Sequence, residues 1–337
     1  MSRTSIVAET KAPKDRSPGP RPRSGDRRTK HRKVPFVTRL RRDYPLLIMI
    51  LPAVIVMITF VYLPLLGNVI AFMDYVPFVP FLENEFTGLQ NFERLFGDEN
   101  FWLALGNTLM FTALNLVFYF PVPIALAIFV HSMLHPWIRS FLQSVLYLPH
   151  FLSWVIVVGF FQQTLGSAGI LNQFLAQSGM DTVNLMQNPE LFKFMIVAQT
   201  VWKDAGWGTI IFLAALSAID DSLYESAAMD GAGVWRRLWH ITLPGIRPII
   251  ILMLILRLGD ALSVGFEQFL LQRDSVGPRA AEVLDTYVYF NGVVAGNWSI
   301  GVAAGLFKGV IGLVLILVAN KVAHLLGEDG IYRNTAK

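Results

Sequence analysis

The side chains with the clearest chemical potential are charged residues inside long apolar segments: Lys203, Asp204, Arg257, Asp260 and Lys308. Charge within hydrocarbon is costly, so such residues usually face the interior of a helix bundle. Arg257 and Asp260 are three residues apart and could pair along one helix face. These residues are candidates for lining a polar path, although structural pairing between helices would also explain them, and Lys308 could reach the membrane surface.

Motifs for covalent, hydrolytic or nucleotide chemistry are missing from the sequence. It has no Cys, which removes disulfides, thiolate catalysis and cysteine-bound metals. Its six His are scattered, without His-Glu-x-x-His or Gly-x-Ser-x-Gly. The phosphate-binding pattern Gly-x-x-x-x-Gly-Lys-Ser/Thr is also absent. We therefore expect no catalytic site, no metal site and no nucleotide bound by this chain.

One polar loop carries strong local structural signals. Ser222 followed three residues later by Glu225 predicts a capping box, and hence the start of a helix. Gly231 and Gly233 offer the left-handed conformation that ends a helix. Pro244 suits the first turn of a following helix. The loop should therefore form a short helix, a turn and a second amphipathic stretch.

The short helix presents small residues, Ser226, Ala227 and Ala228, beside Tyr224 and Met229. A surface of this kind can seat in a groove of another protein at little side-chain ordering cost. An ordinary packed connector would show the same pattern.

The composition requires a lipid environment for the rest of the chain. Of 337 residues, 54% are hydrophobic and 15% are charged, whereas soluble domains have roughly a quarter charged. The apolar runs are too long for barrel strands and predict transmembrane helices. Six segments can be drawn: 46–71, 103–130, 141–163, 194–218, 246–266 and 299–323. Prolines in the first two segments predict kinks.

The charge distribution predicts the orientation. Residues 1–42 hold 14 of the 28 Lys and Arg, opposed by three acids, and such a tail marks the cytoplasmic side. The loop 74–100 carries six acids against Arg94, as an external loop can. Both termini are therefore expected in the cytoplasm. The tail is also rich in Pro, Ser and Gly, which predicts disorder; binding of nucleic acid or anionic lipid is the less favoured interpretation.

The last segment places Gly301, Gly305 and Gly309 four residues apart on one helix face, where helices can approach closely. Packing within the bundle and contact with a second membrane subunit would both use this face.

The stretch from Tyr224 to Pro248 resembles the EAA signature of ABC importer permeases: a Glu-Ala-Ala core, a Gly and then Ile-x-Leu-Pro, with Ser226 replacing the first Ala. Further stretches are similar to the sugar and polysaccharide branch of that family, related to maltose permeases. They are Asn107-Thr108, Pro121-Val122-Pro123-Ile124, Leu148-Pro149-His150-Phe151, Trp202-Lys203, Gly206-Trp207, Gly265-Phe266-Glu267-Gln268, Asp285-Thr286-Tyr287-Val288-Tyr289 and Gly305-Leu306-Phe307-Lys308.

The resemblance implies an all-α, MetI-like permease domain over residues 43–337, in a bacterial inner membrane. Its loop 221–245 would be a coupling loop docked on a cytoplasmic ATPase dimer that holds ATP and Mg. A second, different permease, an external solute-binding protein and a carbohydrate substrate are the other implied partners, with no nucleic acid. The implied coupling residues are Tyr224, Glu225, Ser226, Ala227, Asp230, Gly231, Ala232, Leu243 and Pro244.

Individual residues keep alternative roles. Glu225 would cap the helix or pair with a basic residue of the ATPase, and Asp230 would end the helix or contact the ATPase. Arg236 and Arg237 are most simply positive residues near lipid headgroups. Trp202 and Trp207 could stack on sugar rings, beside Lys203, Asp204, Arg257 and Asp260 on the substrate path; lipid anchoring or core packing is the commoner use of such tryptophans.

Two other functional classes remain open from the residues alone. A transporter driven by an ion gradient would also span the membrane several times, but it should show internal repeats with matching broken helices, and no clear pair is visible. A membrane-embedded enzyme would need a catalytic constellation that the sequence does not show.

Overall fold

The computed structural model describes residues 36–325, 327 and 330. The chain divides into two compact units, residues 1–62 and 63–337. The described part of the first unit is helix α1 (Phe36–Met57) followed by a π-helical turn over Ile58–Tyr62. Within this described part, no hydrophobic side chain from Tyr44 onward is buried. Most of the predicted basic tail, residues 1–35, lies outside the described residues, and α1 begins inside its last part.

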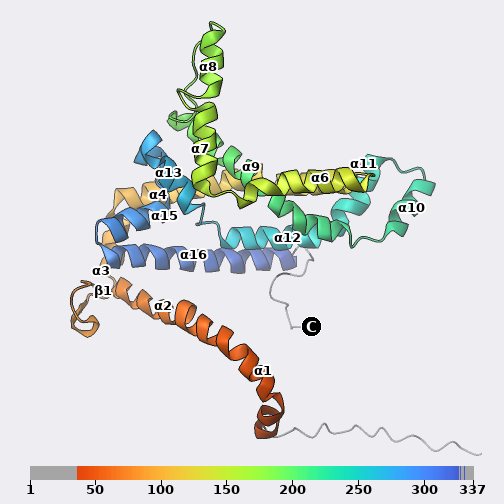
Figure 1. The fold of residues 1–337 in the computed structure, drawn as a ribbon. Coiled ribbons are helices and arrows are strands. Elements are labelled where there is room, and N and C mark those ends of the chain that lie inside the picture. Colours follow the sequence, from red (N-terminus) through yellow and green to blue (C-terminus); the bar gives the residue numbers. More distant parts are fainter. Residues whose placement is uncertain (1–35, 326, 328–329, 331–337) are drawn as a thin grey trace, which may run out of the picture. The chain divides into compact units, whose positions relative to one another are not determined.

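The second unit is almost entirely helical (Figure 1). Its helices are α2 (Leu63–Leu66), α3 (Gln90–Gly97), α4 (Glu99–Leu114), α5 (Pro121–His131), α6 (Pro136–Tyr147), α7 (Trp154–Leu165), α8 (Ile170–Gln177), α9 (Pro189–Leu216), α10 (Asp221–Met229), α11 (Val234–Arg237), α12 (Leu243–Gly259), α13 (Phe266–Val276), α14 (Pro278–Ala281), α15 (Leu284–Tyr287) and α16 (Trp298–Leu325). Two short antiparallel strands, β1 (Met73–Asp74) and β2 (Glu85–Phe86), pair Met73 with Phe86.

Five helical runs in the described residues are long and apolar enough to cross a membrane. They are Asp43–Phe72, Glu99–His131, Trp154–Gln177, Val234–Gly259 and Trp298–Leu325. Helices α9 and α10 give a sixth if the pair, bent by 72°, is counted as one span. The prediction of an all-α membrane protein with about six spans is therefore confirmed.

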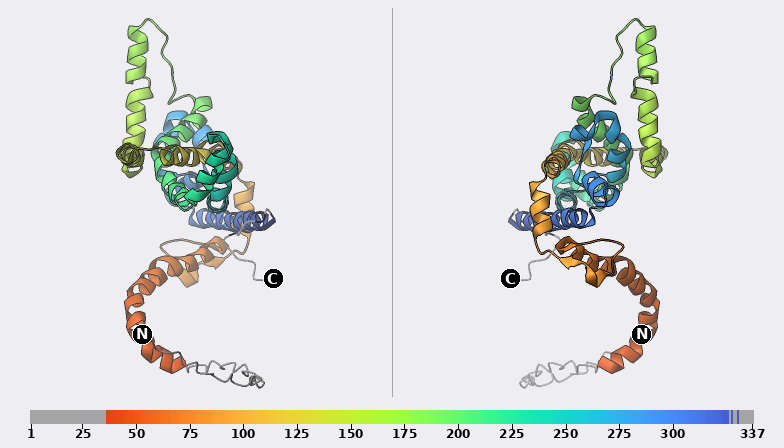
Figure 2. Two further views of the ribbon diagram at one scale, coloured as in Figure 1. Left: turned by 90° about the vertical axis from the view of Figure 1, so that its right-hand side faces the viewer. Right: turned by 90° about the vertical axis from the view of Figure 1, so that its left-hand side faces the viewer.

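The third predicted span, 141–163, is wrong as a single continuous helix. Helix α6 ends at Tyr147, a 3-10 turn covers Leu148–Phe151, and α7 begins at Trp154. Pro149 lacks the amide hydrogen that would continue the helical bonding. Ser153 then accepts a hydrogen bond from the amide of Ile156 and starts the new helix. Figure 2 shows α7 and α8 projecting beyond the other helices of the second unit.

The prolines are accommodated within their own helices. A five-residue π-helical turn ends two residues before Pro64, before Pro121 and before Pro244. A proline ring clashes with the carbonyl four residues earlier, and a wider turn gives that carbonyl room. The proline signal therefore marks local widening of the helix.

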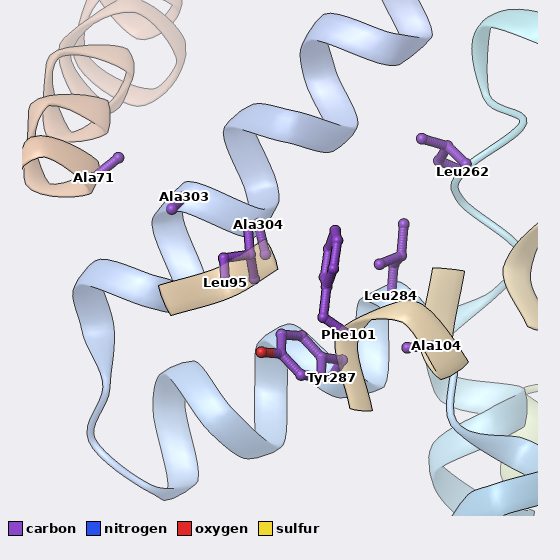
Figure 3. Packing of buried hydrophobic residues seen from close by; sticks show 9 residues of the cluster. All are labelled: Ala71, Leu95, Phe101, Ala104, Leu262, Leu284, Tyr287, Ala303 and Ala304. Atoms are coloured by element: carbon purple, nitrogen blue, oxygen red, sulfur yellow. The ribbon is translucent and has the colours of Figure 1, made fainter. Parts of the chain in front are cut away.

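The buried core of the second unit joins segments that are distant in sequence. Phe101 of α4 meets Tyr287 of α15 edge-to-face, with ring centroids 5.8 Å apart, among the alanines of α16 (Figure 3). Gly301 also packs internally, because an added Cβ would lie 2.7 Å from the Cα of Gly292. Gly305 and Gly309 have open space, so the predicted glycine face divides between internal packing and an uncovered surface.

Candidate functional site

Helix α10 forms the centre of the loop between α9 and α12, and it lies at the opposite end of the second unit from α3, α13 and α15 (Figure 1). Its N-cap is Asp220, whose carboxylate accepts a hydrogen bond from the amide of Ser222 at 2.9 Å. Bonds from Ser222 lower the pKa of the Asp220 carboxyl below its usual value.

The predicted capping box of Ser222 and Glu225 is therefore wrong, because the capping position lies two residues earlier, at Asp220. The exposed Glu225 carboxylate has no hydrogen bond or ion pair among the described residues. It is available to a partner from outside the chain.

The end of α10 has the predicted glycine turn. The amide of Ala232 donates to the carbonyl of Ala227 at 2.8 Å, and that of Gly231 donates to Ala228 at 3.0 Å. This is a Schellman motif, and Gly231 has the left-handed φ of 72° that it requires. Gly233, in contrast, has a φ of −67° and is extended, so its predicted left-handed role is wrong.

The stretch after the turn is continuous with the next membrane helix. Helix α11 passes through a π-helical turn over Leu238–Thr242 into α12, which begins at Leu243 and carries Pro244 in its first turn. The hydroxyls of Tyr224 and Thr242 lie 3.1 Å apart and hydrogen-bond. This bond ties α10 directly to the base of α12. Of the other predicted loop residues, Ser226 and Asp230 are exposed, and Ala227 and Ala232 are partly buried.

A second polar group occupies the break between α6 and α7. The Lys203 ammonium donates to the carbonyl of His150 at 2.6 Å and to that of Leu152 at 2.8 Å. Its side chain is only 8% exposed. These carbonyls lost their helical donors at the break, so Lys203 satisfies them where water is scarce. Its position indicates a structural role.

Asp204 and Trp207 surround the imidazole of His150. The Asp204 carboxylate lies 2.9 Å from His150 Nδ1, and the indole of Trp207 stacks on the ring at 4.5 Å and 7°. Trp202 points elsewhere and stacks on Phe160 of α7, with centroids 5.6 Å apart. The structure therefore groups Asp204 and Trp207 and separates Trp202 from them.

Arg257 lies across from this group on α12. Its guanidinium sits 5.3 Å from the ring centre of Tyr119, whose hydroxyl reaches the Asp204 carbonyl at 3.4 Å. Arg257 and Asp260 line a cavity of about 220 Å³ with Tyr119 and Gly208. Among the described residues no ion pair joins Arg257 to Asp260, so the pairing that their spacing allows is not formed.

Lys308 instead pairs with Asp285. His150 and Tyr119 belong to the polar group but were not predicted as site residues. The family motif Leu148-Pro149-His150-Phe151 includes His150 but does not indicate its partners.

The match to a known family covers residues 119–327, and the family is described as the binding-protein-dependent transport system inner membrane component. This chain belongs to that family.

The permease resembles several characterised relatives. It is 43% identical over 304 residues to the polygalacturonan/rhamnogalacturonan transport system permease protein YteP of Bacillus subtilis, covering 90% of this chain and 95% of that protein. It is 31% identical over 279 residues to the trehalose/maltose transport system permease protein MalF of Thermococcus litoralis, covering 82% and 92%.

A solved structure shares the fold. A chain of the bacterial alginate ABC transporter, crystallised with a periplasmic protein bound to an alginate pentasaccharide, superimposes with a TM-score of 0.79 at 36% identity. The match covers 88% of the permease and 99% of that chain. The resemblance to ABC importer permeases is confirmed, and the permease is a transport component rather than an enzyme. Because the chain belongs to a binding-protein-dependent transport family, the ion-gradient alternative is not retained.

Proposed function

We propose that this chain is the permease subunit of an ATP-driven importer that receives a carbohydrate from a solute-binding protein and couples through α10 to a cytoplasmic ATPase dimer. The relatives that transport glycans support the substrate class. ATP and Mg are held by the ATPase. The second permease is a different chain, so the two form a heterodimer in the bacterial inner membrane.

The observation that carries the coupling role is the geometry of α10. This helix buries no side chain and presents the unpaired carboxylate of Glu225 with the small Ser226 beside it. It is joined to α9 by a four-residue turn and to α12 by the Tyr224–Thr242 bond. A push on α10 is therefore transmitted to two membrane helices, with Glu225 facing a basic residue of the ATPase. This arrangement requires the loop and both chain termini to be cytoplasmic.

The substrate path runs past Asp204, Trp207, Arg257 and Asp260. Trp207 offers an aromatic face for a sugar ring, and Tyr119 orients Arg257. Lys203 serves the path indirectly, because it fixes the broken helix that carries His150. Trp202 of α9 borders it where it stacks on Phe160 of α7.

Arg257 narrows the substrate to an acidic glycan. Lys203 and Lys308 have carboxylates within 4.0 Å, whereas Arg257 has none among the described residues. A guanidinium with free donors beside a cavity suits the carboxylate of a uronic acid, which it can bind through two hydrogen bonds. The descriptions of two relatives name polygalacturonan and alginate, which are glycans of this kind.

The coupling role is tested with Glu225→Arg in the reconstituted importer. We expect loss of uptake and of substrate-stimulated ATP hydrolysis, because like charges would face each other at the docking site. Glu93→Arg, an exposed charge reversal on α3, is the matched control and should leave both activities unchanged. Normal uptake by the Glu225 variant would show that α10 is not the coupling helix.

The acidic substrate is tested with Arg257→Gln and Arg257→Lys. A hydrogen bond to a charged group is worth about 1.5–3 kcal/mol, so we expect uptake of oligogalacturonate to fall about tenfold or more for Gln and less for Lys. ATP hydrolysis at rest should not change. Equal uptake by wild type and the Gln variant would refute the carboxylate contact while leaving the coupling proposal intact.

A further inference from the structure

The first nine residues of the helix that continues into α12 form a basic and aromatic segment, Val234–Thr242, which we call the elbow. Trp235 and Trp239 are 75% and 63% exposed, and both belong to a helix that is long enough to cross the membrane. Arg236 and Arg237 lie between them in sequence, and His240 directly follows Trp239. Tryptophan and basic residues at a helix end are typical of the membrane–water boundary.

A cavity of about 300 Å³ lies between the elbow and α10. Arg236, Arg237 and His240 line one wall, and Ala227, Asp230 and Ala232 line the other. Nε of Arg237 is buried and has no hydrogen-bond partner among the described residues. Nδ1 of His240 is 2.9 Å from the Arg236 carbonyl and donates to it, which leaves Nε2 for another partner.

This donor set selects an anion. A buried N–H without an acceptor is unusual in native proteins, and its natural complement is an oxygen from outside the chain. Two guanidinium groups and an imidazole against one carboxylate, Asp230, leave the cavity positive. Arginine binds phosphate through two parallel hydrogen bonds.

We propose that this cavity binds the phosphate of an anionic phospholipid from the membrane leaflet on the side of the loop. Its acyl chains would lie beside the exposed faces of Trp235 and Trp239, and the Asp230 carboxylate would accept hydrogen bonds from the glycerol hydroxyls of a headgroup such as phosphatidylglycerol. A soluble phosphate would leave both tryptophans uncovered, so the lipid fits the elbow better than the free ion.

The bound lipid contacts α10 as well as the elbow, since Ala227 and Asp230 belong to the same cavity. It therefore stiffens the connection between α10 and α12 from the outside. The lipid site does not depend on the identity of the substrate.

The test measures lipid retained by the complete importer, with its partner subunits, after purification from vesicles of phosphatidylcholine and phosphatidylglycerol. Each basic residue near an anionic surface contributes about a fivefold effect, so Arg236→Gln with Arg237→Gln should lower phosphatidylglycerol affinity roughly 25-fold. Lys321→Gln, an exposed cation at the end of α16, is the matched control and should retain wild-type binding.

A second measurement follows the lipid without removing the arginines. Brominated phosphatidylglycerol should quench wild-type tryptophan fluorescence more than it quenches a variant with Trp235→Phe and Trp239→Phe. Equal lipid retention in the arginine variant and wild type would overturn the proposal. The proposal would also fail if inorganic phosphate displaced the lipid while the tryptophan quenching stayed the same. It would fail as well if the arginine variant lost the ATPase subunits but kept its lipid.

Discussion

Gly231→Ala isolates the turn that ends α10, the proposed coupling helix. Gly231 has a φ of 72°, where a Cβ costs about 1–2 kcal/mol, and no atom within 4 Å would obstruct that Cβ. The effect is therefore backbone strain without a clash. Since α10 has nine residues and buries none, this strain is large compared with the stability of the helix itself. A cost near 1.4 kcal/mol shifts the equilibrium between capped and frayed helix about tenfold.

We expect Gly231→Ala to lower uptake several-fold while the amount of assembled importer stays normal. Gly231→Asn should recover part of the activity, because Asn tolerates the left-handed conformation. Gly233→Ala is the matched control, since that residue is extended with a φ of −67° and should lose nothing. Uptake and ATP hydrolysis of the reconstituted importer measure the effect. Identical activity of the two alanine variants would refute the assignment of Gly231 as the strained cap.

Three further predictions concern packing and polar contacts. Lys203→Met removes two charge-assisted hydrogen bonds and should destabilise the importer by about 3 kcal/mol in thermal unfolding; an unchanged transition would contradict its structural role. Gly206→Ala puts a Cβ 1.9 Å from a backbone oxygen of α6 and should abolish assembly in membranes, whereas Gly106→Ala meets nothing and should assemble normally. Burial and the hydrogen bond to Asp98 raise the pKa of the Tyr287 hydroxyl. The stabilisation from neutral Tyr287 is therefore complete below the ordinary pKa of 10.0 and is lost as pH rises through the pKa of the folded protein. In the difference between wild type and Tyr287→Phe, the phenolate absorbance of Tyr287 should appear only in alkali well above pH 10.

The sequence predicted features that depend on local chemistry or on hydropathy. The spans follow from long apolar runs, and the turn at Gly231 follows from the need for a left-handed residue after a short helix. The capping residue was misassigned because Asp220 and Ser222 are both good N-caps, and a shift of two residues separates the two helix starts. Such competition is settled by the path of the chain out of α9.

Contacts between helices were beyond the reach of sequence reasoning. Pro149 signalled a break in the third segment, but the residue that satisfies the broken helix, Lys203, is 53 positions from the carbonyl of His150. Arg257 and Asp260 have the spacing for a helical ion pair, yet the ring of Tyr119 holds the guanidinium instead. Where a side chain has several possible partners, the packing of the helices determines which contact forms.

The charges in the spans divide into two groups with different consequences. Lys203 binds the carbonyl of His150 at the break between α6 and α7, and Lys308 pairs with Asp285 of α15. Substituting either lysine should therefore first lower the stability of the folded protein. Arg257 has an aromatic support but no carboxylate among the described residues, so changing it should first alter transport. A membrane protein bears the cost of an unneutralised charge where a ligand will supply the counter-charge. The contrast between a stability effect at Lys203 and a substrate effect at Arg257 is therefore the sharpest test of where the path lies.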